Sequence, residues 1–338
     1  MSMVRMMGDR LLQGGLLPAQ AAVGPVVEIA CDESGFSGTN LLHAASPVIT
    51  HASVDLDRDE AIGLIAGLRS RFRCSPDELK SGRLLRRPGA GEALVTELAG
   101  RARVHLVDKE FFLVTRIVDL LVAEPSYAAG TRLTQGQRAA ALALHRAGRA
   151  AGGDWDVFLA AFVDLVRMKR RQPGRATLDR FFRARDALLR AGAVDPVLVA
   201  LDPGRVGAVM TRLDDDDRSI PPPLEPMLPA LAETVLTWSG GHRQVLVVHD
   251  EQSALTAGRL TRLQRALAGT GSLPDGVSPL AGLVMADSRH DPRVQLADLL
   301  AGLARRNRGL IDDAFPAVPV QSETPCLTEF GRQGDVIG

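Results

Sequence analysis

The stretch Val26 to Phe36, V-V-E-I-A-C-D-E-S-G-F, contains a short apolar run that ends on Asp32 and Glu33. Such a run, partly β-branched and followed by Ser-Gly, predicts a buried strand that stops at a turn. A carboxylate pair in this position lies on rigid backbone at a sheet edge, where divalent metals and phosphates are commonly bound. An ordinary Asp-Glu-Ser-Gly turn explains the same residues, because Asp, Ser and Gly all favour turns.

The composition limits the classes of protein to which the chain can belong. Its 338 residues suffice for one large domain or two ordinary ones, and its formal net charge is zero. A globally basic surface is therefore excluded, and any nucleic-acid site must be a local patch. Three scattered cysteines fit the reducing cytoplasm better than a disulfide framework. No apolar window is long enough to span a membrane, so we expect a cytoplasmic protein without a membrane partner.

Lysine is rare in this chain. Of 40 Lys and Arg residues, only Lys80, Lys109 and Lys169 are lysine, and the Ala/Arg/Gly-rich usage is typical of a high-GC bacterium. Where arginine is so strongly favoured, a retained lysine indicates that a compact ammonium group is needed. Lys80 and Lys109 both lie close in sequence to acidic residues.

Three more predicted strands end on acidic residues. Ala102 to Val107 is followed by Asp108 and Lys109, Gln244 to His249 by Asp250 and Glu251, and Leu280 to Ala286 by Asp287 and Ser288. Polar residues often end strands, so the repetition supports a shared site only modestly.

The last predicted helix, Arg293 to Arg306, adds another acid. Its leucines form an apolar stripe, whereas Gln295, Asp298 and Gly302 share an adjoining face. In the plain interpretation Asp298 simply faces water. Gly302, however, has no side chain and lowers helix stability, which indicates that another segment approaches this face closely.

The remaining pattern predicts a second strand, several helices and a long helical middle. We expect a strand at Leu41 to Thr50, a helix at Asp57 to Phe72, a short exposed element at Ser75 to Arg83 and a short helix at Gly91 to Gly100. Ala/Leu/Arg-rich helices follow from Phe111 to about Gly240, and their arginines form either a local basic face or ordinary solvated faces. The four aspartates at 214 to 217 are interpreted as a solvated loop.

Carboxylates from several strand ends and one helix are what a two-metal phosphoryl-transfer site requires. Without a cation, clustered carboxylates repel one another and their pKa values rise. A bound divalent ion would remove this repulsion.

The motifs together resemble a known family. D-E-S-G at 32 to 35, E-L-K at 78 to 80, D-K at 108 to 109, D-E at 250 to 251 and D-S followed by Q-L-A-D-L-L-A-G at 295 to 302 are similar to the bacterial and phage family called domain of unknown function 3800. The resemblance covers about residues 26 to 110 and 240 to 306. It implies an α/β fold, with a ribonuclease H-like mixed sheet flanked by helices and a large helical insertion.

We therefore expect five segments along the chain. They are a flexible leader at 1–24, the first part of the ribonuclease H-like core at 25–110, a helical insertion at 111–240, the second part of the core at 241–310 and an irregular tail at 311–338.

By analogy with ribonuclease H-like enzymes, the resemblance also implies roles for the acids. Asp32 would bridge two metal ions, Mg²⁺ or Mn²⁺, with Asp250 and Asp298 as further ligands. The candidates for a fourth carboxylate are Asp287, Glu33 and Glu251, of which Asp287 is the expected metal ligand. Lys80 would act with the catalytic acids, and the supporting residues would be Ser34, Lys109, Ser288 and Gln295. Whether Asp108 or Asp250 is the strand-end ligand stays open.

The leading hypothesis is a divalent-metal-dependent nuclease or related phosphodiester hydrolase that acts on nucleic acid through metal-activated water. One alternative is a non-catalytic ribonuclease H-like component of a defence or mobile-element system that binds nucleic acid or protein. Another is hydrolysis of small phosphorylated molecules. The sequence contains no P-loop, no dinucleotide-binding glycine motif and no H-E-x-x-H. No oligomeric state is predicted.

Overall fold

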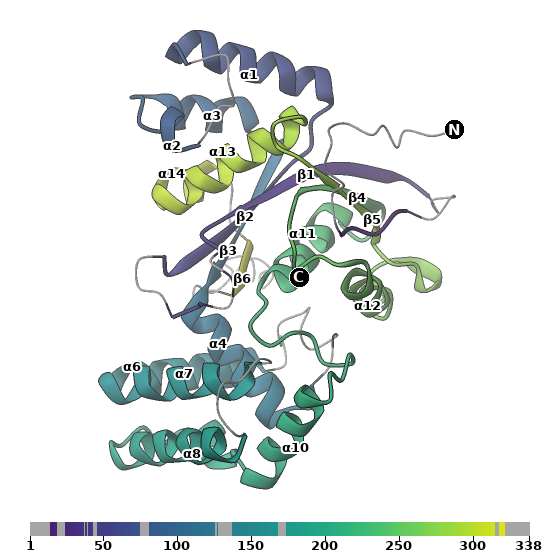
Figure 1. Ribbon diagram of the computed structural model, residues 1–338. Coiled ribbons are helices and arrows are strands. Elements are labelled where there is room, and N and C mark those ends of the chain that lie inside the picture. The colour runs from purple at the N-terminus through teal and green to yellow at the C-terminus, as the bar shows by residue number, and fades with distance from the viewer. Residues whose placement is uncertain are drawn as a thin grey trace, which may run out of the picture. The chain divides into compact units, whose positions relative to one another are not determined.

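The computed structural model describes residues 14–18, 24–36, 38, 40–42, 46–74, 81–125, 127, 137–167, 174–314 and 318–321. In these residues the chain is α/β, with a mixed sheet flanked by helices (Figure 1). This confirms the predicted fold class at that level. The chain divides into two compact units, the first within Met1–Ser34, His51–Arg103 and Thr234–Phe315, and the second within Gly35–Thr50, Val104–Glu233 and Pro316–Gly338.

The strands are β1 (Val26–Ser34), β2 (Val48–Val54), β3 (Ala102–Asp108), β4 (Gln244–Asp250), β5 (Leu280–Ala286) and β6 (Val318–Gln321). The helices are α1 (Arg58–Phe72), α2 (Ser81–Leu84), α3 (Ala90–Leu98), α4 (Lys109–Ile117), α6 (Arg138–Ala150), α7 (Gly153–Val166), α8 (Gly174–Arg190), α9 (Pro196–Ala200), α10 (Pro203–Asp214), α11 (Met227–Ser239), α12 (Ala257–Ala268), α13 (Pro292–Arg306) and α14 (Arg308–Ala314), with a π-helix η1 (Val118–Val122) and a 3₁₀ turn η2 (Pro274–Gly276).

The sheet has the strand order β5-β4-β1-β2-β3-β6, and β1 is parallel to β4, which is parallel to β5. Cys31 of β1 lies opposite His249 of β4, and His249 lies opposite Met285 of β5. Because these strands run in the same direction, their carboxyl ends meet at one edge of the sheet. That edge holds the acidic residues that end each strand.

Helix α13 forms the centre of the first unit. It packs against β1 on one side and against α1, α2, α3 and α14 on others (Figure 1). The leucines of its apolar stripe are all buried, namely Leu296, Leu299, Leu300 and Leu303. A helix this apolar is stable only when it is covered almost all round, which fixes its position over β1.

The close approach predicted for Gly302 is present. A Cβ atom built on Gly302 would lie 2.6 Å from Cβ and 2.8 Å from Oγ of Ser81, the first residue of α2. Only glycine leaves room for this contact. The part of the predicted Ser75 to Arg83 element that carries Glu78 and Lys80 lies outside the described residues.

Helix α1 begins as its sequence predicts. Asp57 caps the helix by accepting a 2.7 Å hydrogen bond from the Glu60 backbone N–H, and the Glu60 carboxylate accepts one of 3.0 Å from the Asp57 N–H. This capping box satisfies N–H groups that a helix start leaves without intrahelical partners.

Three expectations are corrected in the described residues. The second strand begins at Val48, after Pro47, and runs to Val54 rather than covering Leu41 to Thr50. Residues 14–18 of the predicted flexible leader are bound to β5, with Leu16 and Leu283 exchanging backbone hydrogen bonds of 2.8 and 2.7 Å. The predicted irregular tail contains α14 and also β6, which is parallel to β3. Each correction reflects pairing with a distant segment, which a local pattern does not reveal.

The described part of the second unit is mostly helical, and its core includes an aromatic cluster in which Phe158 and Phe162 of α7 contact Phe181 of α8. Helices α9 and α10 also lie in the region where helices were predicted. Each starts with an aspartate cap followed by proline, Asp195-Pro196 and Asp202-Pro203, which is a recognised start signal. Among the described residues, no helix combines the length and the apolar character that crossing a bilayer demands.

Candidate active site

The ends of β1 and β4 bring Asp32 and Asp250 together. Asp32 follows Cys31 and Asp250 follows His249, and Cys31 and His249 are register partners. The two aspartates therefore occupy equivalent positions at the carboxyl ends of neighbouring parallel strands. The sequence analysis predicted this juxtaposition.

Asp32 is the most buried acid of the group, with 6% of its surface exposed. Its Oδ1 accepts a 2.7 Å hydrogen bond from the Glu33 backbone N–H. Burial raises the pKa of Asp32 well above its ordinary value, and the charges of Glu33, Asp250 and Asp298 raise it further. These four carboxyl groups form an electrostatically coupled cluster, which we call the carboxylate cluster.

Glu33 is half-buried and is held by a glutamine from the loop after β4. The Gln252 Nε2 donates a 2.6 Å hydrogen bond to Glu33 Oε1, and the Gln252 Oε1 accepts one of 3.2 Å from the Ala254 N–H. Burial raises the pKa of Glu33 to about 7, although the Gln252 bond acts in the opposite direction. Glu33 therefore titrates at neutral pH. Sequence reasoning missed the role of Gln252, because its position two residues after a strand-end acid gives no specific signal.

Asp250 is held by backbone groups. Its Oδ1 accepts a 3.2 Å hydrogen bond from the Ser288 N–H, which belongs to the loop after β5. Burial raises the pKa of Asp250, while hydrogen bonds from the backbone of Glu251 and Ser288 lower it. Ser288 thus supports the cluster through its main chain.

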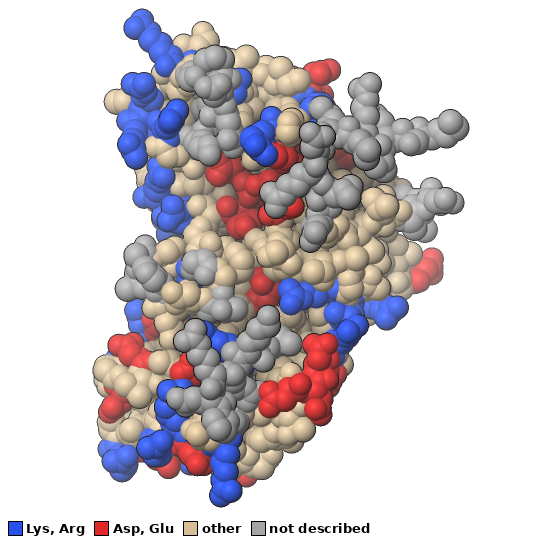
Figure 2. All heavy atoms as spheres, viewed as in Figure 1, with Lys and Arg blue, Asp and Glu red and all other residues tan. Residues whose placement is uncertain are grey.

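Helix α13 supplies the other predicted residues. Asp298 is half-buried and contributes its charge to the cluster, and Gln295, one turn earlier, is buried. Near the end of the same helix, the Arg305 Nε donates a 3.0 Å hydrogen bond to Ser34 Oγ and so ties α13 to the end of β1. Figure 2 shows acidic side chains gathered in a compact patch over α13 and β1.

Asp287, the fourth predicted metal ligand, is paired with an arginine in this structure, and its role as a ligand stays a prediction. Both of its carboxylate oxygens are engaged by Arg289, with Nε at 3.0 and 3.1 Å and Nη2 at 2.5 Å. These bonds, led by the side-chain hydrogen bond of Arg289, lower the pKa of Asp287 to about 2. A cation that binds Asp287 would have to compete with these charge-assisted hydrogen bonds.

The other predicted residues are placed as follows. Asp108 caps α4, since its Oδ1 accepts a 2.9 Å hydrogen bond from the Phe111 N–H, and both it and the buried Lys109 belong to the second unit. Glu251 is exposed. Lys80 lies outside the described residues. Of the two strand-end candidates left open by the sequence, Asp250 is the one that interacts with Asp32.

Two buried histidines, His249 and His51, lie next to the end of β4 that carries Asp250. The His249 Nδ1 is 2.9 Å from the Asp250 carbonyl oxygen, and His249 Nε2 is 3.1 Å from His51 Nε2, whose Nδ1 is 2.8 Å from Thr234 Oγ1. Burial lowers the pKa of His249, so the ring is neutral and its Nδ1–H donates to the carbonyl. His249 therefore positions the strand end rather than carrying protons to solvent.

The donor set of the carboxylate cluster suits a hard divalent cation, because such cations prefer carboxylate oxygens and because a cation would offset the repulsion that raises these pKa values. The residues that would hold it are Asp32, Asp250 and Asp298, with Glu33 beside them. Among the described residues, however, no three His, Cys, Asp or Glu side chains are placed so that they could hold a metal ion together. A cation would therefore have to draw these side chains closer.

Comparison of the chain with protein-family models, with curated proteins and with solved structures gave no match.

Proposed function

We propose that the first unit is a Mg²⁺- or Mn²⁺-dependent phosphodiester hydrolase that cleaves nucleic acid. The observation that carries this proposal is the carboxylate cluster, in which a buried Asp32 is coupled to the charges of Glu33, Asp250 and Asp298. Such a cluster is unfavourable unless the site binds a cation or holds protons. Perturbed carboxylates of this kind are typical of functional sites.

The fold supports the same proposal. In the sheet order β5-β4-β1-β2-β3-β6, β1 is parallel to β4 and β4 to β5, and the acids lie at the ends of β1 and β4 and on the helix after β5. This is the arrangement of strand-end and helix carboxylates that the resemblance to ribonuclease H-like proteins implies. We propose a ribonuclease H-like fold and membership of the domain of unknown function 3800 family on this basis.

Each residue of the cluster has a role in this proposal. A bound divalent ion would activate the attacking water and stabilise the leaving oxygen. Asp32, Asp250 and Asp298 would bind this ion and orient it. The Gln252 amide holds the Glu33 carboxylate in place through its hydrogen bond. Because the pKa of Glu33 is about 7, its carboxylate can accept the proton that the water loses at neutral pH.

The test uses Asp32→Asn, which keeps the shape of the side chain and removes its charge. We expect the variant to lose Mn²⁺ binding in isothermal titration and to hydrolyse single- and double-stranded DNA and RNA at least about a hundredfold more slowly than the wild type. Asp275→Asn, a change at an exposed aspartate with a positive φ of 55° that Asn also tolerates, is the matched control and should retain both properties.

Equal hydrolysis by the wild type and Asp32→Asn would refute the proposal. Metal binding and nucleic-acid binding without hydrolysis of any of these substrates would instead favour a non-catalytic binding component. Hydrolysis restricted to nucleotides in the same panel would assign the site to small phosphorylated molecules.

A further inference from the structure

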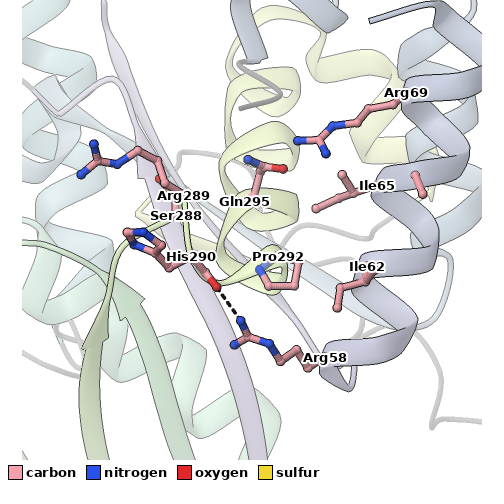
Figure 3. Close-up of a pocket in the computed structure, with 10 residues that line it drawn as sticks. Arg58, Ile62, Ile65, Arg69, Ser288, Arg289, His290, Pro292 and Gln295 are labelled. Carbon is pink, nitrogen blue, oxygen red and sulfur yellow. Dashed lines mark hydrogen bonds between the residues drawn. The ribbon is translucent and has the colours of Figure 1, made fainter. Parts of the chain in front are cut away.

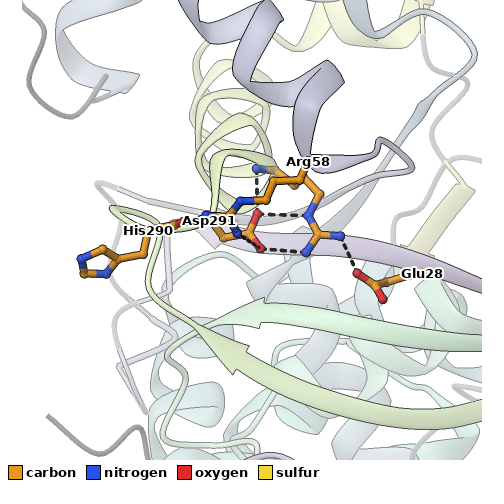
Figure 4. Close-up of polar contacts among 5 residues, drawn as sticks. Glu28, Arg58, His290 and Asp291 are labelled. Atoms are coloured by element: carbon orange, nitrogen blue, oxygen red, sulfur yellow. Dashed lines mark hydrogen bonds and ion pairs between the residues drawn. The ribbon is translucent and has the colours of Figure 1, made fainter. Parts of the chain in front are cut away.

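The arginines around α13 occupy two different environments. At the start of the helix, Arg293 pairs with Asp291 and with Glu28 of β1, and Arg58 lies 4.0 Å from Asp291 (Figure 4). Two guanidinium groups and two carboxylates leave this network without net formal charge. The adjoining pocket of about 660 Å³ is lined by Arg58 and by Arg289, which has an aspartate partner of its own (Figure 3). These paired arginines therefore do not mark an anion site.

The opposite end of α13 carries arginines without acidic partners. Five exposed arginines surround it, and we call them the arginine rim: Arg83, Arg86 and Arg87 from α2 and the turn after it, and Arg305 and Arg306 from the last turn of α13. Among the described residues, no ion pair joins any of the five to an aspartate or glutamate. Residues 81–91 and 299–309 contain no acidic residue, so neither segment offsets the positive charge of the rim.

Close packing of α2 on α13 brings the two groups of the rim together. Only glycine at position 302 leaves room for Ser81 of α2. Arg306 Nη1 lies 3.5 Å from the Ser81 carbonyl oxygen, and a Cβ atom built on Gly82 would lie 3.7 Å from Arg306 Nη2. Arg83 follows directly along the chain. Figure 2 shows Lys and Arg side chains in a column at the left of this unit, in the region of α2, with the acidic patch beside them.

The rim adjoins the carboxylate cluster through Arg305. The Arg305 Nε donates a 3.0 Å hydrogen bond to Ser34 Oγ, two residues after Asp32 at the end of β1. No partner among the described residues engages the two terminal nitrogens of Arg305, so both can bind a ligand. Asp298 lies on the same face of α13, about 10 Å away along the helix axis, a distance that roughly three stacked nucleotides span. A strand with a phosphodiester at the cluster would therefore reach the rim.

The chemistry of the rim fits a chain of phosphates. Guanidinium groups bind phosphate oxygens through paired, charge-assisted hydrogen bonds. A surface that binds a membrane combines basic with exposed apolar side chains, but none of the large apolar side chains that are exposed in the described residues belongs to the two segments of the rim. A nucleic-acid strand supplies both the bond for the carboxylate cluster and further phosphates for the arginines.

We propose that the arginine rim binds backbone phosphates of the nucleic-acid strand, on one side of the bond that the carboxylate cluster hydrolyses. The proposal deepens the proposed nuclease function and rests on it, since that function supplies the strand. Contacts to phosphates carry no sequence information, so the rim holds the strand in position without selecting its bases.

The test measures binding without cleavage. Fluorescence anisotropy in EDTA gives the Kd of labelled single-stranded DNA and RNA over a range of salt concentrations, for the wild type and for the triple variant Arg83→Gln/Arg86→Gln/Arg87→Gln. We expect the triple variant to bind at least about tenfold more weakly at physiological salt. Its slope of log Kd against log salt should be smaller by about 2, because each phosphate contact with a single strand contributes about 0.7 to the slope.

A matched variant removes the same charge from the second unit. Arg146→Gln, Arg175→Gln and Arg183→Gln, combined in one protein, change exposed arginines that form no ion pair among the described residues. This variant should bind both nucleic acids like the wild type. Mn²⁺ titration should give the wild-type affinity for both triple variants, since neither changes a residue of the carboxylate cluster.

The outcomes separate the rim from the nuclease. A wild-type Kd for the rim variant, an equal loss in the matched variant, or no nucleic-acid binding by the wild type would overturn the proposal. Rim-dependent binding to phosphatidylserine vesicles, without binding to either nucleic acid, would also overturn it and assign the rim to a membrane surface. Rim-dependent nucleic-acid binding without hydrolysis in Mn²⁺ would refute the nuclease and leave the rim in place, so the two proposals fail separately.

Discussion

Asp32 and Asp291 are equally buried acids in the same unit, each with 6% of its surface exposed, yet their environments are opposite. Burial raises the pKa of Asp291, but the hydrogen bonds and charge of Arg293 outweigh it and leave the pKa below its ordinary value. At Asp32, burial and three neighbouring carboxyl groups act together and raise the pKa. The comparison teaches that the arginine partner, rather than burial, decides in which direction the pKa of a buried acid shifts here.

Within the carboxylate cluster, Asp32 and Glu33 have no such arginine partner among the described residues, although the chain is rich in arginine. In the described part of the chain, no arginine contacts Asp32 or Glu33, whereas Asp287 and Asp291 nearby each have one. Uncompensated carboxylates lower the stability of the folded protein, and proteins retain such groups mainly at functional sites. The following changes test this contrast, from the largest expected effect to the smallest.

Removing Arg293, the partner of Asp291, should change the free energy of unfolding more than any other substitution in this series. Arg293→Met leaves a buried carboxylate without its guanidinium, so we expect the free energy of unfolding at pH 7 to fall by about 3–5 kcal/mol. Urea unfolding measures this change. The double variant Arg293→Met/Asp291→Asn should recover part of the loss, because it also removes the uncompensated charge; a double variant less stable than Arg293→Met would contradict the comparison.

Removing a carboxyl group from the carboxylate cluster should raise the free energy of unfolding rather than lower it. The pKa of Glu33 is raised to about 7, so its contribution to stability is present below pH 4.5 and is lost as the pH rises through 7. Glu33→Gln should therefore be more stable than the wild type by about 1–3 kcal/mol at pH 8. At pH 4.5 the two proteins should be nearly equal. Urea unfolding at both pH values measures the difference. A variant less stable than the wild type at pH 8 would show that the ionised Glu33 does not destabilise the folded protein.

A substitution at Asp287 should have the smallest effect on stability and on Mn²⁺ affinity, because this residue is partly exposed and paired with Arg289. Asp287→Asn should lower the free energy of unfolding by no more than about 1 kcal/mol, as for other solvent-accessible ion pairs. Its Mn²⁺ affinity should stay within about threefold of the wild type, since Arg289 already engages both carboxylate oxygens of Asp287. A Mn²⁺ affinity that falls as far as in Asp32→Asn would restore Asp287 to the metal site.

The sequence predicted the elements that have a clear local pattern. The ends of β5 agree with the prediction at both residues, and the acid-terminated strands placed Asp32 and Asp250 at one edge because parallel strands share the direction of their carboxyl ends. The second strand was misplaced, since a run of apolar residues before Pro47 does not show which side of the proline pairs with the sheet.

The site was predicted less completely. The ion pair of Asp287 with Arg289 was not foreseen, because nothing in D-S-R-H shows that the arginine two residues later pairs with the carboxylate. Gln252 and the arginine rim were missed because tertiary packing, rather than any spacing in the sequence, brings them beside the cluster.

The central claim is that the carboxylate cluster holds protons which a divalent cation displaces. Isothermal titration of Mn²⁺ into the wild-type protein at pH 7, in Tris and in Pipes buffers of equal ionic strength, tests it most directly, because proton release makes the apparent enthalpy depend on the buffer. We predict proton release on binding and an affinity that rises between pH 6 and pH 8, since Asp32 and Glu33 both have raised pKa values. No Mn²⁺ binding, or binding with the same enthalpy in both buffers, would contradict the claim.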